Sequence, residues 1–95
     1  MLALRDKAIW LLPKSERYGG WPASGEIDLM ESRGNVNLTD IVGRNIGVNQ
    51  FGSTVHFGPN WKYDSYSHTH YTKNAKTDME FHEIFHDYEM LWTPG

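Results

Sequence analysis

The chain has 95 residues, a formal net charge of −3, a sequence pI near 5.9 and no cysteine. This length allows one domain at most, and the missing cysteines exclude disulfide scaffolds, thiolate zinc sites and thiol catalysis. The mild acidity argues against a nucleic-acid partner, which normally meets a basic surface. No apolar run approaches the roughly 18 residues needed to span a bilayer, so we also expect no membrane insertion.

Frequent glycines and prolines divide the chain into short segments, a pattern typical of an all-β protein. In chain order, the predicted strands are residues 8–12, 26–32, 45–50 and 53–57. The first is continuously apolar, so we expect it to be buried on both faces. Residues 84–92 fit a helical stripe and a strand face equally well, and periodicity does not decide between the two.

Three carboxylates lie within six residues of the second predicted strand: Glu26, Asp28 and Glu31. Strict alternation places Glu26 and Asp28 on one face and Glu31 on the other. A β-bulge near Leu29 and Met30 would add one residue and return Glu31 to the first face. Such a row has a chemical use, because cleaving a glycosidic bond requires a carboxylate and a carboxylic acid at the same bond. A third acid between them can hold a proton. The alternative is a solvated strand face that carries three acids.

Four blocks of sequence extend this pattern over nearly the whole chain. They are A-I-W-L-L-P from Ala8, W-P-A-S-G-E-I-D-L-M-E-S-R-G-N from Trp21, G-S-T-V-H-F-G-P from Gly52 and F-H-D-Y-E-M-L-W-T-P from Phe85. In this order they resemble family sixteen of the glycoside hydrolases, the laminarinase-like proteins. The nearest branch resembles the invertebrate β-1,3-glucanases and β-1,3-glucan-binding (pattern-recognition) proteins.

The resemblance implies an all-β fold, a β-sandwich jelly roll of the concanavalin A-like lectin and glucanase type. A domain of this kind needs roughly 200–250 residues. We therefore expect residues 1–95 to be a partial segment, the central part of the catalytic domain with the catalytic strand. A secreted, extracellular location is also implied by the resemblance, although the first residues, with charges at Arg5, Asp6 and Lys7, do not form a signal peptide.

The resemblance also implies a reaction. Glu26 matches the family's nucleophile, Asp28 its auxiliary acid and Glu31 its general acid/base, for retaining hydrolysis of β-1,3-glucan or mixed β-1,3/1,4-glucan. The expected partner is a β-1,3-glucan polysaccharide or oligosaccharide, with no cofactor and no metal. An alternative is a non-catalytic β-1,3-glucan-binding protein of innate immunity, which would use the same cleft without cutting.

Three further residues are candidates for substrate binding. Trp21 matches a position that stacks on a glucosyl ring, and His56 matches a histidine in the family's cleft beside the catalytic strand. Trp10 lies on a neighbouring strand and either lines the cleft or packs in the core. Tyr88 and Trp92 are expected in the core.

Two other patterns carry possible metal chemistry. His82-Glu83-Ile84-Phe85-His86 matches H-E-x-x-H, which on a helix places two imidazoles one turn apart with a glutamate base beside them. A zinc metallopeptidase is therefore a remote alternative, because no histidine follows His86 as a third ligand. His68 and His70 would share one face of a strand, but their polar neighbours predict a solvated loop. Arg33 either pairs with an acid of the cluster or contacts substrate.

Overall fold

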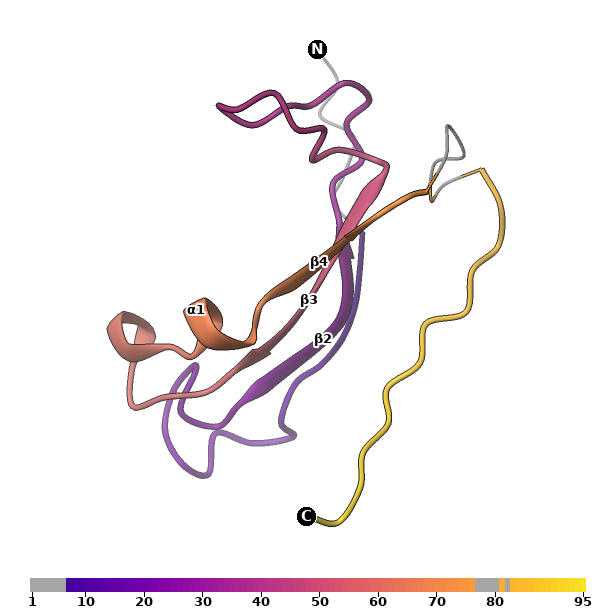
Figure 1. Cartoon of the computed structure of the whole chain (residues 1–95). Helices are drawn as coiled ribbons and strands as arrows, with labels where there is room; N and C mark the ends of the chain where they lie inside the picture. The colour runs from indigo at the N-terminus through magenta and orange to yellow at the C-terminus, as the bar shows by residue number, and fades with distance from the viewer. Residues whose placement is uncertain (1–6, 77–80, 82) are drawn as a thin grey trace.

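The structure is a computed structural model that describes residues 7–76, 81 and 83–95 (Figure 1). Its elements are β1 (Lys7–Leu11), β2 (Glu26–Ser32), β3 (Gln50–His56), the 3-10 helix η1 (Trp61–Tyr63), α1 (Tyr66–Thr69) and β4 (Tyr71–Asn74). The strands form one antiparallel sheet in the order β1-β2-β3-β4. The all-β prediction is confirmed, and the two-sheet jelly roll and the place of residues 1–95 in a larger domain stay predictions.

The predicted strand 53–57 is confirmed as part of β3, but the predicted strand 45–50 is wrong. Residues 45–49 lie in the connection between β2 and β3, where Asn45 makes an isolated bridge with Thr39. Strand β3 begins at Gln50 and runs without a break through Gly52, which had indicated a turn. Strand β4 was not predicted, because its polar sequence, Tyr-Thr-Lys-Asn, is typical of an exposed edge rather than of a core strand.

The predicted β-bulge in β2 is confirmed by the register. Asp28 pairs with Thr54 of β3, but Glu31 pairs with Gly52, so three steps along β2 match two steps along β3. The register with β1 shifts at the same place. The Ser53 hydroxyl donates a hydrogen bond of 2.6 Å to the Leu29 carbonyl at the bulge. The extra residue therefore changes which face of the sheet Glu31 occupies.

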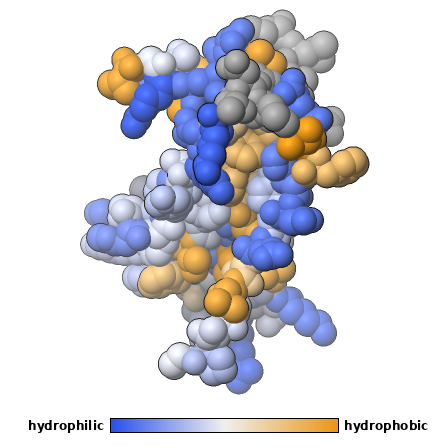
Figure 2. Space-filling model, turned by 45° about the vertical axis from the view of Figure 1, so that its right-hand side comes forward, coloured by the Kyte–Doolittle hydropathy of each residue, from blue (hydrophilic) through white to orange (hydrophobic). Residues whose placement is uncertain are grey.

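Strand β1 differs from the prediction. All five of its residues are exposed, and Ile9 and Leu11 keep 45% and 50% of their surface in contact with solvent. The expected burial on both faces is wrong, because β1 is an edge strand that pairs only with β2. Among the described residues, no second sheet covers it. Apolar side chains therefore reach the surface at several places, as Figure 2 shows.

The C-terminal residues lie beside the sheet, on the side opposite α1 (Figure 1). They form neither helix nor strand over residues 85–95, so both periodicity interpretations of this segment are wrong. The Phe51 ring meets Phe81 and Tyr88 edge-on, with ring centroids 5.0 and 5.2 Å apart. Tyr88 is half-buried against this face, but Trp92 is 72% exposed and does not belong to a core.

The buried apolar core of the described residues is small. Its buried members are Met30 of β2 and Val48 of the following connection. Buried polar residues are equally prominent, namely Asp28, Thr54 and Ser65. No helix in the described part of the chain is long and apolar enough to cross a membrane.

Candidate active site

The bulge and the register place the three predicted acids on one face of the sheet, which we call the acid face. Glu26, Asp28 and Glu31 pair with His56, Thr54 and Gly52, alternate residues of β3 that share one side of the strand. The register with β1 places Trp10 opposite Asp28 and Ala8 opposite Glu31. The acid face therefore combines a row of carboxyl groups with Trp10, which is 49% exposed beside them.

Asp28 is the buried centre of the row. It is 2% exposed, and neither carboxyl oxygen accepts a hydrogen bond from a described donor. Burial raises its pKa from 3.8 to about 6, and the negative charges of Glu31 and Glu26 add to the rise. The opposing influence is that of His56. A group in this position holds a proton well above the pH at which an ordinary aspartic acid loses it.

Glu26 is held by Trp21. The indole Nε1–H donates a hydrogen bond of 2.6 Å to Glu26 Oε2, which leaves Oε1 as the free oxygen of this carboxylate. The Trp21 ring is 46% exposed and lies 5.2 Å from the His56 ring, tilted by 53°. Trp21 thus contacts the candidate nucleophile through its edge and still presents part of its surface to the solvent.

His56 connects the acids of β2 to the loop that follows β3. Its Nε2 lies 3.2 Å from Asp28 Oδ2, and its Nδ1 lies 2.6 Å from Asp64 Oδ2. The prediction that His56 lies beside the catalytic strand agrees with this position. Sequence reasoning missed Asp64, because a lone aspartate after Trp-Lys-Tyr carries no motif. Only the path of the loop brings it to the ring.

A second histidine, His70, lies on the same face. Its Nδ1 lies 2.8 Å from Thr54 Oγ1, its ring stacks on Tyr66 at 4.4 Å, and it covers Gly52. A Cβ on Gly52 would come within 2.7 Å of the His70 ring, so any larger residue there would have to displace the ring. Burial lowers the pKa of His70. The prediction of a solvated loop around His70 is wrong, because the short helix α1 turns the ring back onto the sheet.

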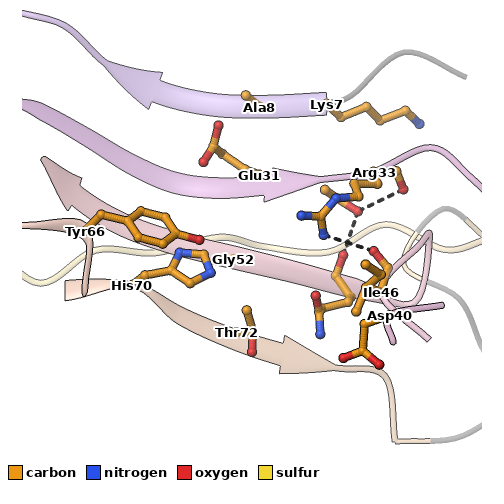
Figure 3. Close-up of a pocket in the computed structure, with 12 residues that line it drawn as sticks. Lys7, Ala8, Glu31, Arg33, Asp40, Ile46, Gly52, Tyr66, His70 and Thr72 are labelled. Carbon is orange, nitrogen blue, oxygen red and sulfur yellow. Dashed lines mark hydrogen bonds between the residues drawn. The ribbon is translucent and has the colours of Figure 1, made fainter. Parts of the chain in front are cut away.

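His70 and Glu31 line a pocket of about 370 Å³ at one end of the acid face (Figure 3). Tyr66, Thr72, Gln50 and Arg33 also line it. The Arg33 guanidinium donates a hydrogen bond of 3.2 Å to the Ile46 carbonyl at the pocket wall, and no ion pair with a described acid is formed. The candidate acid/base is therefore next to an open space with hydrogen-bonding groups.

The same groups bear on metal binding. Ligand atoms of Glu26, Asp28 and His56 lie within 4.8 Å of one another, which is a spacing that a cation or a shared proton could use. In the H-E-x-x-H motif, His82 lies outside the described residues. Glu83 and His86 are described but are not in a helix, so the helical arrangement expected for a zinc peptidase is not found there.

Comparison with known proteins gives three informative matches. The chain is 45% identical over 86 residues, 90% of its length, to a β-1,3-glucan-binding protein of Penaeus monodon. It is 34% identical over 85 residues, again 90% of the chain, to glucan endo-1,3-β-glucosidase A1 of Niallia circulans. It is also 34% identical over 89 residues, 92% of the chain, to a glucan endo-1,3-β-glucosidase of Cryptopygus antarcticus.

The chain spans 22%, 11% and 27% of these three relatives, in the same order. No protein-family model matches the chain, and no solved structure matches it. The resemblance that began with the Trp21 block is nevertheless confirmed over nine-tenths of the sequence. The chain is thus similar, over about nine-tenths of its own length, to one segment of a β-1,3-glucan-binding protein and of two glucan endo-1,3-β-glucosidases.

Proposed function

We propose that the protein hydrolyses β-1,3-glucan, or mixed β-1,3/1,4-glucan, by a retaining double displacement. The observation that carries this proposal is the bulge in β2, which puts Glu26, Asp28 and Glu31 on one face. A retaining glycosidase needs a nucleophilic carboxylate and a separate carboxylic acid on either side of the scissile bond. The names of two relatives, both glucan endo-1,3-β-glucosidases, support the substrate class.

In the first step, Glu26 Oε1 attacks the anomeric carbon while protonated Glu31 gives its proton to the leaving glycosidic oxygen. The carbon–oxygen bond breaks, and a glycosyl ester forms on Glu26. In the second step, Glu31 takes a proton from a water molecule, which attacks the same carbon and releases Glu26. The Trp21 hydrogen bond to Glu26 Oε2 fixes the carboxylate so that the opposite oxygen is the free one.

Asp28 separates the roles of the two outer glutamates. Three adjacent negative charges without compensation are costly, and a pKa of about 6 lets Asp28 keep a proton while Glu26 is ionised. Protonation of Asp28 also removes a negative charge beside Glu26 and so stabilises Glu26 as the leaving carboxylate when the glycosyl ester breaks. Asp28 thus tunes the charge of the nucleophile rather than reacting itself.

The residues around the acids fit a sugar chain. Trp21 and Trp10 are each about half exposed on the acid face, as stacking platforms for glucosyl rings require. The pocket beside Glu31 offers a guanidinium, an amide and hydroxyl groups, which match the hydroxyl groups of a leaving glucan. A glucan that lies across the acid face would therefore meet aromatic rings at Trp21 and polar groups beyond Glu31.

A second candidate function is glucan binding without hydrolysis. The match at 45% identity carries the name of a β-1,3-glucan-binding protein, and retained carboxylates do not prevent a recognition role. Under this alternative the protein acts as a secreted sensor of innate immunity, and the acid face binds the glucan but does not cut it.

The substitution Glu26→Gln distinguishes the two functions in the native protein. It keeps the size of the side chain and the acceptor oxygen for Trp21, but it removes the nucleophile. We expect laminarin hydrolysis to fall by about 10⁴-fold or more, with glucan binding retained. Glu16→Gln is the matched control, because Glu16 is an exposed glutamate outside β2. Unchanged hydrolysis in Glu26→Gln contradicts its assigned role, and binding without hydrolysis in the unmodified protein supports the second function.

A further inference from the structure

The loop between β3 and α1 brings a fourth carboxylate to the acid face. Asp64 Oδ2 lies 2.6 Å from His56 Nδ1, while His56 Nε2 faces Asp28 Oδ2 at 3.2 Å. The side chains are 9%, 13% and 1% exposed for Asp64, His56 and Asp28. The imidazole is therefore enclosed between two carboxyl groups, one from the loop and one from the catalytic strand.

The position of Asp64 is fixed by the backbone of this loop. The Ser65 hydroxyl accepts a hydrogen bond of 3.0 Å from the Phe57 N–H and donates one to the Val55 carbonyl. The Ser65 N–H donates to the Phe57 carbonyl at 2.9 Å. These bonds join the residue after Asp64 to the end of β3, which carries His56. Asp64 and His56 are therefore held in register by bonds that do not involve their own side chains.

The neighbours of His56 limit where its protons can be. The Tyr66 ring stacks on the imidazole with ring centroids 5.9 Å apart, and the tilted Trp21 ring lies 5.2 Å away. Neither ring carries a charge, and the charged groups described at the two imidazole nitrogens are Asp28 and Asp64. Asp64 can only accept from Nδ1–H when it is ionised. In the neutral ring Nε2 then has a lone pair directed at Asp28, which is favourable only if Asp28 carries a proton.

We propose that Asp64 is a positioning residue that keeps the proton of neutral His56 on Nδ1, so that Nε2 is presented to Asp28. His56 and Asp28 then share one proton beside Glu26, and Asp64 determines the direction in which it is shared. The buried Asp28 oxygens, which meet no other described donor, fit this arrangement. The catalytic consequence rests on the proposed hydrolysis, whereas the protonation pattern of the ring does not.

Nuclear magnetic resonance of the ¹⁵N-labelled chain tests the proposal without any assay of activity. Long-range ¹H–¹⁵N spectra distinguish the two neutral tautomers and the imidazolium. We expect His56 Nδ1 to keep its proton throughout the pH range in which the chain is folded, with its N–H signal far downfield. In Asp64→Ala the downfield signal should disappear and the neutral ring should change to the Nε2–H form. Asp87→Ala is the control, because Asp87 is an exposed carboxylate outside the acid face.

A second variant covers the possibility that Asp64→Ala does not fold. Asp64→Asn keeps the acceptor oxygen but lacks the charge, so Nδ1 should retain its proton while its signal moves upfield, because a neutral acceptor makes a weaker bond. The Nε2–H tautomer in the unmodified chain contradicts the proposal. So does an unshifted Nδ1–H signal in both variants.

Kinetics of the native protein then connect the pattern to catalysis. We expect Asp64→Asn to lower kcat for laminarin by about 10- to 100-fold with little change in KM, and to displace the pH profile. A purely structural role would change neither the tautomer nor the pH profile in a variant that folds. If the unmodified protein shows no hydrolysis, the proposed function fails, but the ring protonation still decides the role of Asp64.

Discussion

The two faces of the sheet are built in different ways. The acid face is held by three sets of polar contacts. Trp21 donates a hydrogen bond to Glu26, His56 lies between Asp28 and Asp64, and His70 pairs with Thr54. On the opposite face, the C-terminal segment contacts the sheet mainly through the rings around Phe51. The polar face is thus ordered by specific bonds, and the apolar face by a few ring contacts beside exposed side chains.

This difference shows which part of the molecule is built locally. The contacts of Asp28, Thr54, His56, Asp64 and His70 join only β2, β3 and the loop up to His70, and Trp21 joins them from the connection before β2. The apolar face keeps Ile9, Leu11 and Trp92 in contact with solvent. Substitutions that damage the acid-face loop should therefore cost more stability than those that remove a ring from the other face.

The largest expected effect belongs to Gly58→Ala, in the loop that carries Asp64. Gly58 has a φ of +146°, and a Cβ there would come within 2.2 Å of the Tyr63 carbonyl oxygen. Backbone strain and the clash together should lower the free energy of unfolding by about 4 kcal/mol. Chemical denaturation measures this. Gly20→Ala is the control, because nothing lies within 4 Å of its Cβ position. Equal stability of the two variants would show that the loop is not tightly built.

The next effect concerns the buried proton. A rise in the pKa of Asp28 from 3.8 to about 6 means that the folded state binds the proton more tightly than the unfolded state. The resulting stabilisation is complete below pH 4, is lost between pH 4 and 6, and amounts to about 3 kcal/mol. Asp28→Asn does not titrate, so it should be more stable than the unmodified chain at pH 8 and should lose this pH dependence. Parallel stability curves for the two proteins, measured by urea denaturation, would contradict the assignment.

The smallest effect is expected on the apolar face. Phe51→Ala removes both edge-on ring contacts and should cost about 2 kcal/mol. It should also release the C-terminal segment, which limited proteolysis would detect as faster cleavage within residues 83–95. Phe85→Ala provides the control on the same segment, because Phe85 is fully exposed and should change neither stability nor cleavage. Equal cleavage rates in both variants would show that the rings around Phe51 do not hold the segment.

Strand β2 was predictable from sequence because its signals are local. The alternation at Glu26 and Asp28 predicted the strand. Strict alternation would place Glu31 on the opposite face, and this predicted the bulge. The start of β3 was not predictable in the same way. Gly52 indicated a turn, but it lies inside β3, where its missing side chain makes room for His70, 18 residues later in the sequence.

The rest of the acid face depends on contacts between distant residues. Asp64 has no motif, and the pattern of His68 and His70 gave no sign of a place at the acids. Asp64 and His70 reach the sheet through the hydrogen bonds of Ser65 and the turn of α1. The expected burial of β1 was wrong for a related reason. An apolar sequence predicts that a strand needs a cover, but it does not say which residues provide one.

The central claim is that Glu26 and Glu31 act as nucleophile and acid/base of a retaining glycosidase. The most direct test is ¹H NMR of laminarin hydrolysis by the native protein, with the anomeric signals recorded before mutarotation. Two successive displacements at the anomeric carbon predict that the first products are β-anomers. Initial α-anomers would mean a single displacement by water and would contradict the account.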